Sequence, residues 1–249
     1  MDELGTRADA IALRYFGARD LRVDEKFDHS PVTQADREIE GVTRGLARER
    51  HPELGILGEE EGESTAGRAE AGRLIIDPID GTRNFVRGIP IFATLLAVEV
   101  SGEVVAGLVS APALRMRWHA MRGGGAFRDG RPIRVSRVGA LNQALLFHTN
   151  LGRGEPPPPP RFFDLARRVD RTRGFGDFYQ HVLVAEGAGE VALDPDTRPW
   201  DVAPLQLIVE EAGGRATTLQ GERSIYGGSF VTSNGVVHEA VLAGLAPGA

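Results

Sequence analysis

Residues 74–85 read LIIDPIDGTRNF, a pattern typical of a buried β-strand that runs into an acidic turn. The apolar run 74–76 is short and is bounded by turn residues, which favours a strand over a helix. Asp77 follows the run directly, Pro78 stiffens the chain behind it, and Asp80 adds a second acid. We therefore expect two carboxylates at the end of one strand.

This turn predicts a metal site. Asp77 and Asp80 flank Ile79, whose backbone carbonyl can point into the same volume, and Gly81 allows close approach of the backbone. Carboxylates that are forced together repel each other, so their convergence is favoured mainly where a hard divalent cation such as Mg²⁺ binds between them. Mg²⁺ next to backbone N–H donors suits phosphoryl chemistry, because it neutralises phosphate charge and activates water.

The sequence supports neither of two common nucleotide-binding motifs. The phosphate-binding loop Gly-x-x-x-x-Gly-Lys-Ser/Thr does not occur, because the only lysine, Lys26, has a different sequence context. Residues 187–192, GAGEVA, fit a dinucleotide fingerprint but follow a helical pattern, so we interpret them as a helix end. The sequence favours a phosphatase over a kinase.

Other acidic positions have structural as well as functional explanations. Residues 59–61 are three glutamates, which alone are typical of a solvated loop, and only Glu59 is a candidate because it directly follows a glycine. Thr33-x-x-Asp36 is a helix capping box, and Asp201 stands where a helix N-terminus is predicted. Taken alone, each of these patterns favours the structural explanation.

Hydrophobic periodicity predicts the helices and strands. Residues 4–16 form an amphipathic helical pattern, and a second helix carrying Ile39, Val42 and Leu46 follows Thr33. Further helices are predicted at residues 161–170, 178–187, 201–212 and 236–245. Strands are predicted at residues 74–76, 92–100, 104–109, 126–127, 145–147, 191–193, 216–219 and 229–231, with a hairpin turn at Ser101-Gly102.

The chain is predicted to form one domain over residues 1–249 with two halves. The first half, to about residue 140, has a mixed α+β pattern, and the second, from about residue 141, alternates helices and strands as α/β proteins do. Five prolines at 156–160 favour an extended surface connection. His119 and His148 lie in strand-like runs, where we expect them to be packed.

Composition limits the classes of protein and of metal site. Because the chain has no cysteine, a metal needs oxygen or imidazole ligands. A net charge of −6 without a basic stripe argues against nucleic acid and anionic membranes as partners. No stretch reaches about 18–20 uninterrupted apolar residues, and no signal-peptide pattern begins the chain. We expect a soluble, cytoplasmic protein.

Together these motifs resemble the inositol monophosphatase family of magnesium-dependent phosphatases. The central string is DPIDGTRNF at 77–85, preceded by GEE at 58–60 and followed by WDVAP at 200–204. KFDHSPVTQAD at 26–36 and EAGG at 211–214 extend the match in family order. The resemblance implies an α+β fold, a layered αβαβα sandwich of the inositol monophosphatase and fructose-1,6-bisphosphatase type, usually as a homodimer.

The resemblance also implies a ligand set for two or three Mg²⁺ ions. Glu59, Asp77 and the carbonyl of Ile79 match the ligands of a first ion. Asp77, Asp80 and Asp201 match those of a second ion, and Glu59 also faces a third, weaker one.

Further residues match the groups that handle phosphate and water. Gly81 and Thr82 correspond to the phosphate-binding amides, and Thr82 with Asp36 resembles the pair that helps to activate the attacking water alongside Glu59. The implied mechanism is in-line attack of a metal-activated water on phosphorus, without a covalent enzyme intermediate. Asp36 would then serve both its helix and the site, and Lys26, which opens the same motif, suggests a point charge near the site.

Local strings resemble histidinol-phosphate phosphatases more closely than inositol enzymes, notably GTRNFVRGIP at 81–90 and RGFGDF at 173–178. Histidinol carries an ammonium group and an imidazole, so additional acids suit it, and we assign Asp177, Asp194 and Asp196 to substrate binding. Arg83 departs from the lysine that histidinol enzymes often have.

We therefore expect hydrolysis of the small phosphate ester L-histidinol phosphate, in histidine biosynthesis. Inositol 1-phosphate or another small phosphate ester is the alternative substrate. The intact ligand set disfavours a non-catalytic regulatory relative.

Overall fold

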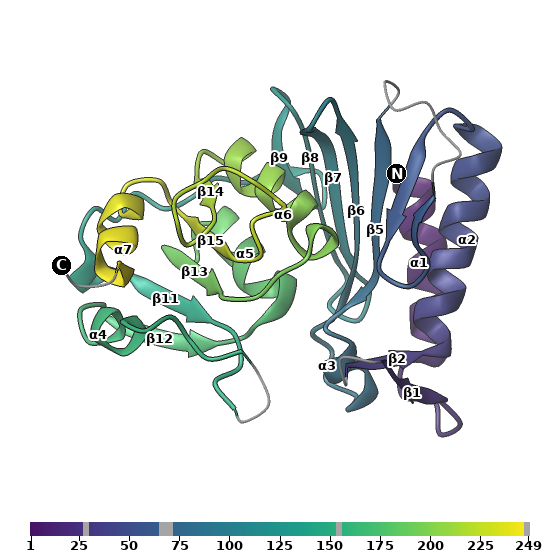
Figure 1. Cartoon of the computed structure of the whole chain (residues 1–249), viewed down its shortest axis with the longest axis horizontal. Helices are drawn as coiled ribbons and strands as arrows, with labels where there is room; N and C mark the ends of the chain where they lie inside the picture. The colour runs from purple at the N-terminus through teal and green to yellow at the C-terminus, as the bar shows by residue number, and fades with distance from the viewer. Residues whose placement is uncertain (27–29, 65–71, 153–155, 247–249) are drawn as a thin grey trace.

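The structure is a computed structural model of the chain, and it describes residues 1–26, 30–64, 72–152 and 156–246. Its helices and sheets form five layers (Figure 1). Helices α1 (Asp2–Tyr15) and α2 (Gln34–Arg50) form the first layer, α5 (Asp177–Ala185) and α6 (Pro199–Glu211) the middle one, and α4 (Phe162–Ala166) and α7 (His238–Leu245) the last. Because a sheet separates each pair of helical layers, the predicted αβαβα sandwich is confirmed.

The larger sheet has eight strands in the order β10-β9-β8-β7-β6-β5-β3-β4. Neighbouring strands are antiparallel, except that β3 and β5 are parallel. In chain order its strands are β3 (Gly55–Gly58), β4 (Gly62–Ser64), β5 (Arg73–Asp80), β6 (Ala93–Val100), β7 (Glu103–Ala111), β8 (Met116–Met121), β9 (Gly125–Arg128) and β10 (Arg131–Pro132). A two-stranded sheet, β1 (Val23–Glu25) with β2 (Pro31–Thr33), leads into α2.

Strand β5 is buried on both faces, which explains its continuous apolar run. Leu74 and Ile76 pack in the core below α1 and α2, together with Leu108. Ile75 points to the opposite side and packs in the core around α5 and α6. Ile75 therefore faces the middle layer, whereas Ile79, further along the strand, packs in the core beside α1 and α2.

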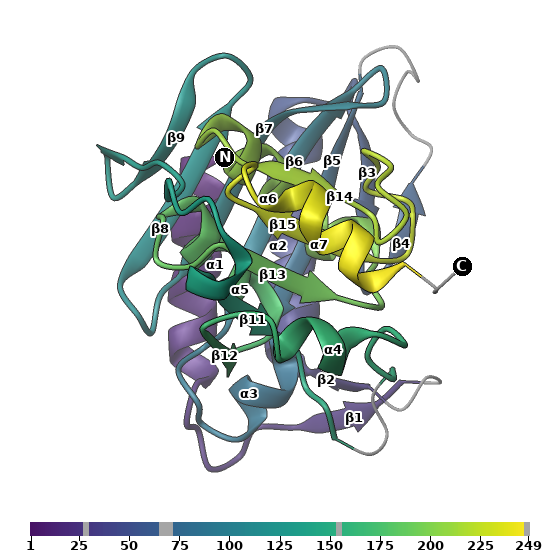
Figure 2. The ribbon, with the colours of Figure 1, turned by 90° about the vertical axis from the view of Figure 1, so that its left-hand side faces the viewer.

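The smaller sheet has five strands in the order β12-β11-β13-β15-β14, and α4 and α7 cover its outer face (Figure 2). Its strands are β11 (Leu145–His148), β12 (Arg171–Gly174), β13 (Val191–Asp194), β14 (Arg215–Thr217) and β15 (Phe230–Ser233). Strand β11 pairs in parallel with β12 and β13, whereas β15 pairs antiparallel with β13 and β14.

Helix α6 lies between the two sheets, and every residue from 202 to 209 is buried. A helix that contacts apolar surface on all sides needs apolar residues on all sides, which explains the sequence VAPLQLIV. Pro199 is its first residue, a position where the missing N–H costs nothing. The helix therefore joins the two halves, and its packing between the sheets fixes the position of its N-terminal turn.

Most predicted elements are confirmed, and the exceptions are exposed or depend on tertiary pairing. The helix predicted at 161–170 ends at Ala166, and residues 171–174 form β12 instead. This edge strand has the sequence RTRG and is largely exposed, so it has no apolar alternation that could reveal it. The prolines 156–160 form neither helix nor strand and lie at the surface, as predicted. Within the described residues, no helix combines the length and apolarity that a membrane span requires.

Contact between α6 and the larger sheet requires Gly107 of β7. A Cβ atom at this position would lie 3.0 Å from Cα and 3.1 Å from the carbonyl oxygen of Pro204. We expect Gly107→Val to lower the free energy of unfolding by about 2 kcal/mol, because backbone atoms cannot yield as a side chain can. Urea unfolding measures the change.

Gly45→Ala in α2 is the matched control. A Cβ atom at Gly45 has no heavy atom within 4 Å, so alanine should raise stability by roughly 0.5–1 kcal/mol through its better helix propensity. Equal stability of Gly107→Val and the wild type would contradict the proposed close packing.

Candidate active site

An irregularity in β5 turns Asp77 and Asp80 toward the same layer. In a regular strand, residues three positions apart point to opposite faces. Here the register with β6 shifts, because Asp77 pairs with Leu95 whereas Asp80 pairs with Ala93. Three steps along β5 therefore match two along β6, as in a β-bulge, and both aspartates can face the middle layer.

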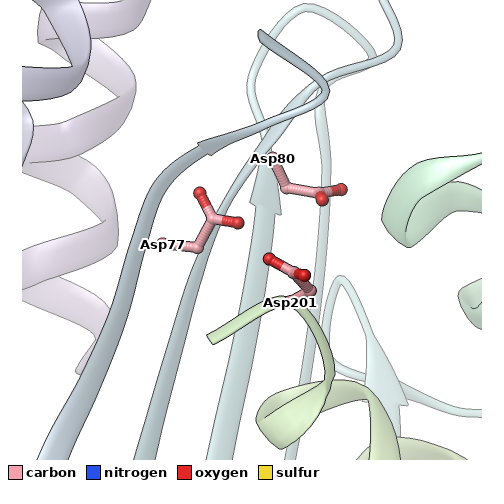
Figure 3. Close-up of side chains that lie close together, drawn as sticks. All are labelled: Asp77, Asp80 and Asp201. Carbon is pink, nitrogen blue, oxygen red and sulfur yellow. The ribbon is translucent and has the colours of Figure 1, made fainter. Parts of the chain in front are cut away.

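Asp201 completes an acidic cluster with these two residues (Figure 3). It is the third residue of α6, and its Oδ2 accepts the N–H of Arg198, the N-cap residue, at 2.7 Å. Asp77, Asp80 and Asp201 can each offer one carboxylate oxygen, and these three atoms lie within 4.8 Å of one another. The strand and the helix thus bring together acids that are more than 120 residues apart in the sequence.

Burial and mutual repulsion disfavour the charged forms of these acids. Asp77 is 2% exposed, and its Oδ1 has no hydrogen-bond partner among the described residues. Burial raises the pKa of Asp77 and Asp80 well above the usual range, and neighbouring carboxylates raise it further. Burial also raises the pKa of Asp201 to about 7. Convergent, oxygen-only donors that repel each other fit Mg²⁺, which would offset their charge.

Glu59 lies beside this cluster, at the end of β3. Its charge raises the pKa of Asp77, although burial is the larger cause. Its Oε1 forms an ion pair with Lys26 Nζ at 2.7 Å, and the same ammonium group contacts Glu60 Oε1 at 2.6 Å. The only lysine therefore stands at the site, as its place in the motif suggested, while residues 27–29 of that motif lie outside the described residues.

Asp36 belongs to the helix and to the site at once. Its Oδ2 accepts the Thr33 N–H at 2.8 Å, which forms the predicted capping box of α2. Its Oδ1 lies 3.4 Å from the hydroxyl of Thr82, which also donates to the Ile79 carbonyl at 2.8 Å. Burial raises the pKa of Asp36 to about 6.

The remaining predicted residues line two cavities that share part of their walls. A cavity of about 560 Å³ is bordered by Glu59, Gly81, Thr82 and Asp177. A second, of about 270 Å³, is bordered by the acidic cluster and by Ile79, Asp194 and Asp196, as well as by residues of the first. Every predicted site residue except Asp36 therefore lines at least one of these cavities. Asp36 does not line them, but its carboxylate lies next to the Thr82 hydroxyl.

The three predicted substrate acids differ in their surroundings. Asp177 opens α5 with a backbone φ of +51°, and its Oδ2 accepts a hydrogen bond from Asn84 Nδ2 at 3.0 Å. Asp194 is half-buried, and burial raises its pKa well above the usual range. Asp196 is exposed and lies 3.7 Å from Arg198, so it is the most solvated of the three.

Asn84 and His148 are among the cavity residues that were not assigned to the site from the sequence. Asn84 joins the halves by donating to Asp177 and to the Ile91 carbonyl, and only its place in the string GTRNF could have indicated it. His148 is half-buried and contacts Phe162, which agrees with the packing predicted for it, but it also lines the larger cavity. His119 stacks on Phe127.

The raised pKa values predict how stability of the metal-free protein changes with pH. Asp77, Asp80 and Asp201 have pKa values above their unfolded value of about 4, so the folded protein binds more protons and becomes more stable as pH falls from 8.5 to 7. Each proton taken up adds about 1.4 kcal/mol per pH unit. Urea unfolding in the presence of EDTA measures this slope.

Histidine does not obscure the effect in this range. Burial lowers the pKa of His181 to about 3 and that of His238 to about 4, so both stay neutral in the folded protein, and the unfolded value of about 6.5 lies below the range. A stability that is constant or that increases with pH between 7 and 8.5 would contradict the electrostatic description. Asp201→Asn should reduce the slope.

Comparison with known proteins agrees with the fold. The profile of the inositol monophosphatase family matches residues 2–247. A histidinol-phosphatase of Mycobacterium tuberculosis is 48% identical over 98% of this chain and 96% of its own, and one of Chlorobaculum parvum is 39% identical over 99% and 95%. The crystal structure of the extragenic suppressor protein suhB from Bartonella henselae superimposes with a TM-score of 0.91 at 29% identity, covering 100% of this chain and 98% of that one. With the match extending over nearly the whole chain and both sheets, the protein belongs to the inositol monophosphatase family.

Proposed function

We propose that the protein is a Mg²⁺-dependent phosphomonoesterase that hydrolyses L-histidinol phosphate to L-histidinol and phosphate. The observation that carries the proposal is the cluster of Asp77, Asp80 and Asp201 next to a cavity that contains further acids. The 48% identity to a histidinol-phosphatase over nearly the whole chain supports the choice of substrate.

The acidic residues are proposed to hold two or three ions. Glu59, Asp77 and the Ile79 carbonyl would bind one ion, and Asp77, Asp80 and Asp201 a second, with Glu59 also facing a third. Bound Mg²⁺ supplies charge neutralisation of the phosphate and a lowered pKa for a water molecule. Asp77 Oδ1, which has no hydrogen-bond partner in the described part of the chain, supports this assignment, because a buried oxygen without a partner is costly unless a cation or donor reaches it.

Thr82 and Asp36 are proposed to orient the attacking water, alongside Glu59. The single hydroxyl proton of Thr82 donates to the Ile79 carbonyl at 2.8 Å in this structure. If it turns to Asp36 Oδ1, which lies 3.4 Å away, the hydroxyl oxygen can accept a hydrogen bond from water. Asp36 has a pKa of about 6, so it is mostly ionised at neutral pH and can accept this hydrogen bond. The backbone N–H groups of Gly81 and Thr82 are proposed to bind the phosphate, because Gly81 has a φ of +81° and both residues border the cavities.

Asp177, Asp194 and Asp196 are proposed to recognise the cationic part of histidinol. A carboxylate gains from an ammonium or imidazolium group, whereas the neutral hydroxyl groups of inositol offer it only hydrogen bonds. Asp177 is the strongest of the three candidates, because it borders both cavities and Asn84 fixes one of its oxygens. Inositol 1-phosphate is the alternative substrate, in keeping with the name of the family.

We further propose that the chain acts as one domain, because the cluster takes ligands from both halves. A homodimer in the cytoplasm that serves histidine biosynthesis, without a nucleic-acid or membrane partner, completes the proposal. The charge of −6 supports the absence of a polyanionic partner.

Phosphate release tests the choice of substrate. We expect the purified protein to hydrolyse histidinol phosphate with a kcat/KM at least about tenfold above that for inositol 1-phosphate, corresponding to about 1.4 kcal/mol from charge recognition, and EDTA should abolish both activities. Asp177→Asn should reduce the ratio of the two kcat/KM values, because it should raise the KM for histidinol phosphate and leave that for inositol 1-phosphate unchanged. A preference for inositol 1-phosphate would exclude the proposed substrate, and no release from any ester would exclude the phosphatase function.

Removing one carboxylate tests the metal site. We expect Asp80→Asn to lower kcat by about a thousandfold, because a metal ion supplies several kcal/mol of transition-state stabilisation. Metal-free Asp80→Asn should be at least as stable as the wild type, because the substitution removes a repulsive charge. Activity close to that of the wild type in the stable variant would contradict the proposed ligand set.

A further inference from the structure

We infer that Glu40 and Arg44 of α2 are positioning residues that hold Glu59 in place for metal binding. This inference rests on the proposed function, in which Glu59 is a metal ligand. The two side chains form an ion pair in the interior, with Glu40 0% and Arg44 2% exposed. They lie below the turn formed by residues 59–62, which we call the acidic turn.

Glu40 uses both carboxylate oxygens on the acidic turn. Oε2 accepts the N–H of Glu60 at 2.8 Å, and Oε1 accepts the N–H of Glu61 at 2.9 Å. Arg44 contacts Glu40 Oε1 through Nε and Nη2, both at 2.8 Å, and donates through Nη2 to the carbonyl of Gly62. Three consecutive residues of the turn are therefore bound through their main chain to one buried ion pair.

The N-terminal side of Glu59 is fixed separately, by the larger sheet. The Glu59 N–H donates to the Ile76 carbonyl of β5 at 3.2 Å, and Gly58 is paired with Ile76 in the parallel register. Glu59 thus stands between two anchored segments, the end of β3 before it and the bound main chain of 60–62 after it. Its side chain forms the ion pair with Lys26 at 2.7 Å, and its charge raises the pKa of Asp77.

Gly58 shows how closely the ion pair approaches the chain. A Cβ atom at this position would lie 2.2 Å from Glu40 Oε1 and 2.7 Å from Arg44 Nη2. The glycine before Glu59 is therefore required by the ion pair below it, since any other residue would displace the carboxylate that binds the turn.

Stability alone is a weak reason for this arrangement. Desolvation of two charges in an interior usually costs about as much as their attraction returns, and an apolar pair often stabilises a protein equally well. An apolar pair would leave the N–H groups of Glu60 and Glu61 without these acceptors. The ion pair is thus suited to fixing the conformation of the acidic turn, as residues behind metal ligands commonly do.

Mg²⁺ binding without substrate tests the inference. By isothermal titration of the metal-free protein, Glu40→Gln should weaken Mg²⁺ binding about tenfold, the usual size of the effect for residues behind a metal ligand. In a Glu59→Gln background the same substitution should change the affinity less than about twofold, because Glu40 acts through Glu59. Glu190→Gln is the matched control, since Glu190 is also buried and accepts the Leu145 N–H at 2.6 Å, but in the other half of the chain.

If Glu40→Gln does not fold, Arg44→Lys takes its place, because it keeps both charges and alters only the planar contacts to Glu40 and Gly62. We expect a smaller loss of Mg²⁺ affinity that again disappears in the Glu59→Gln background. Equal losses with and without Glu59, or a loss no larger than that of Glu190→Gln, would overturn the positioning role. If the wild type itself bound no Mg²⁺, the proposed function would fail and the inference with it.

Discussion

The mutual repulsion of Asp77, Asp80 and Asp201 is the constraint on which the rest of the structure depends. Three carboxylates that meet in the interior would separate if the surrounding chain allowed it, because burial and like charge both disfavour them. The packing of the chain prevents this separation. Strand β5 lies deep in an eight-stranded sheet, and α6 is enclosed between two sheets, so neither can move without opening a core. The packing energy of two sheets thus holds in place a site that is electrostatically unfavourable without a cation.

Three acids of the site, Asp36, Asp80 and Asp201, also accept backbone N–H groups at helix starts, which reduces the cost of their placement. Asp36 accepts the Thr33 N–H in the capping box of α2, Asp201 accepts the N–H of the N-cap residue Arg198 of α6, and Asp80 accepts the Phe178 N–H at 2.6 Å at the start of α5. Each of these hydrogen bonds stabilises the charged carboxylate and lowers its pKa against the effect of burial. Structural and chemical explanations of these acids are therefore not alternatives. A residue that fixes the first turn of a helix is already held rigidly enough to bind a ligand.

The sequence predicted the layers and proposed candidate site residues that the structure places around two cavities, but it did not predict the contacts that connect them. Buried strands and amphipathic helices were recognisable because one periodicity dominates each of them, as in residues 74–76 and 34–50. Edge strand β12 was missed because its side chains are exposed and only pairing with β11 defines it. The shift in register that turns Asp80 toward Asp77 has no signal of its own, since it depends on β6. Likewise, nothing in the sequence pairs Asn84 with Asp177, which lie 93 residues apart.

The acidic cluster and part of the wall of the larger cavity draw on different parts of the fold, and this separation bears on how such an enzyme can diversify. The acidic cluster stands on β5 and α6, inside the packed layers. The wall of the larger cavity, in contrast, includes residues 149–151 after β11 and 175–176 between β12 and α5, which lie in connections. Connections tolerate insertion and exchange far better than buried strands do. Substitutions in these connections can therefore change how the alcohol part of a phosphate ester is recognised while the hydrolytic centre stays unchanged. One scaffold can in this way give rise to enzymes that share a reaction and differ in substrate specificity.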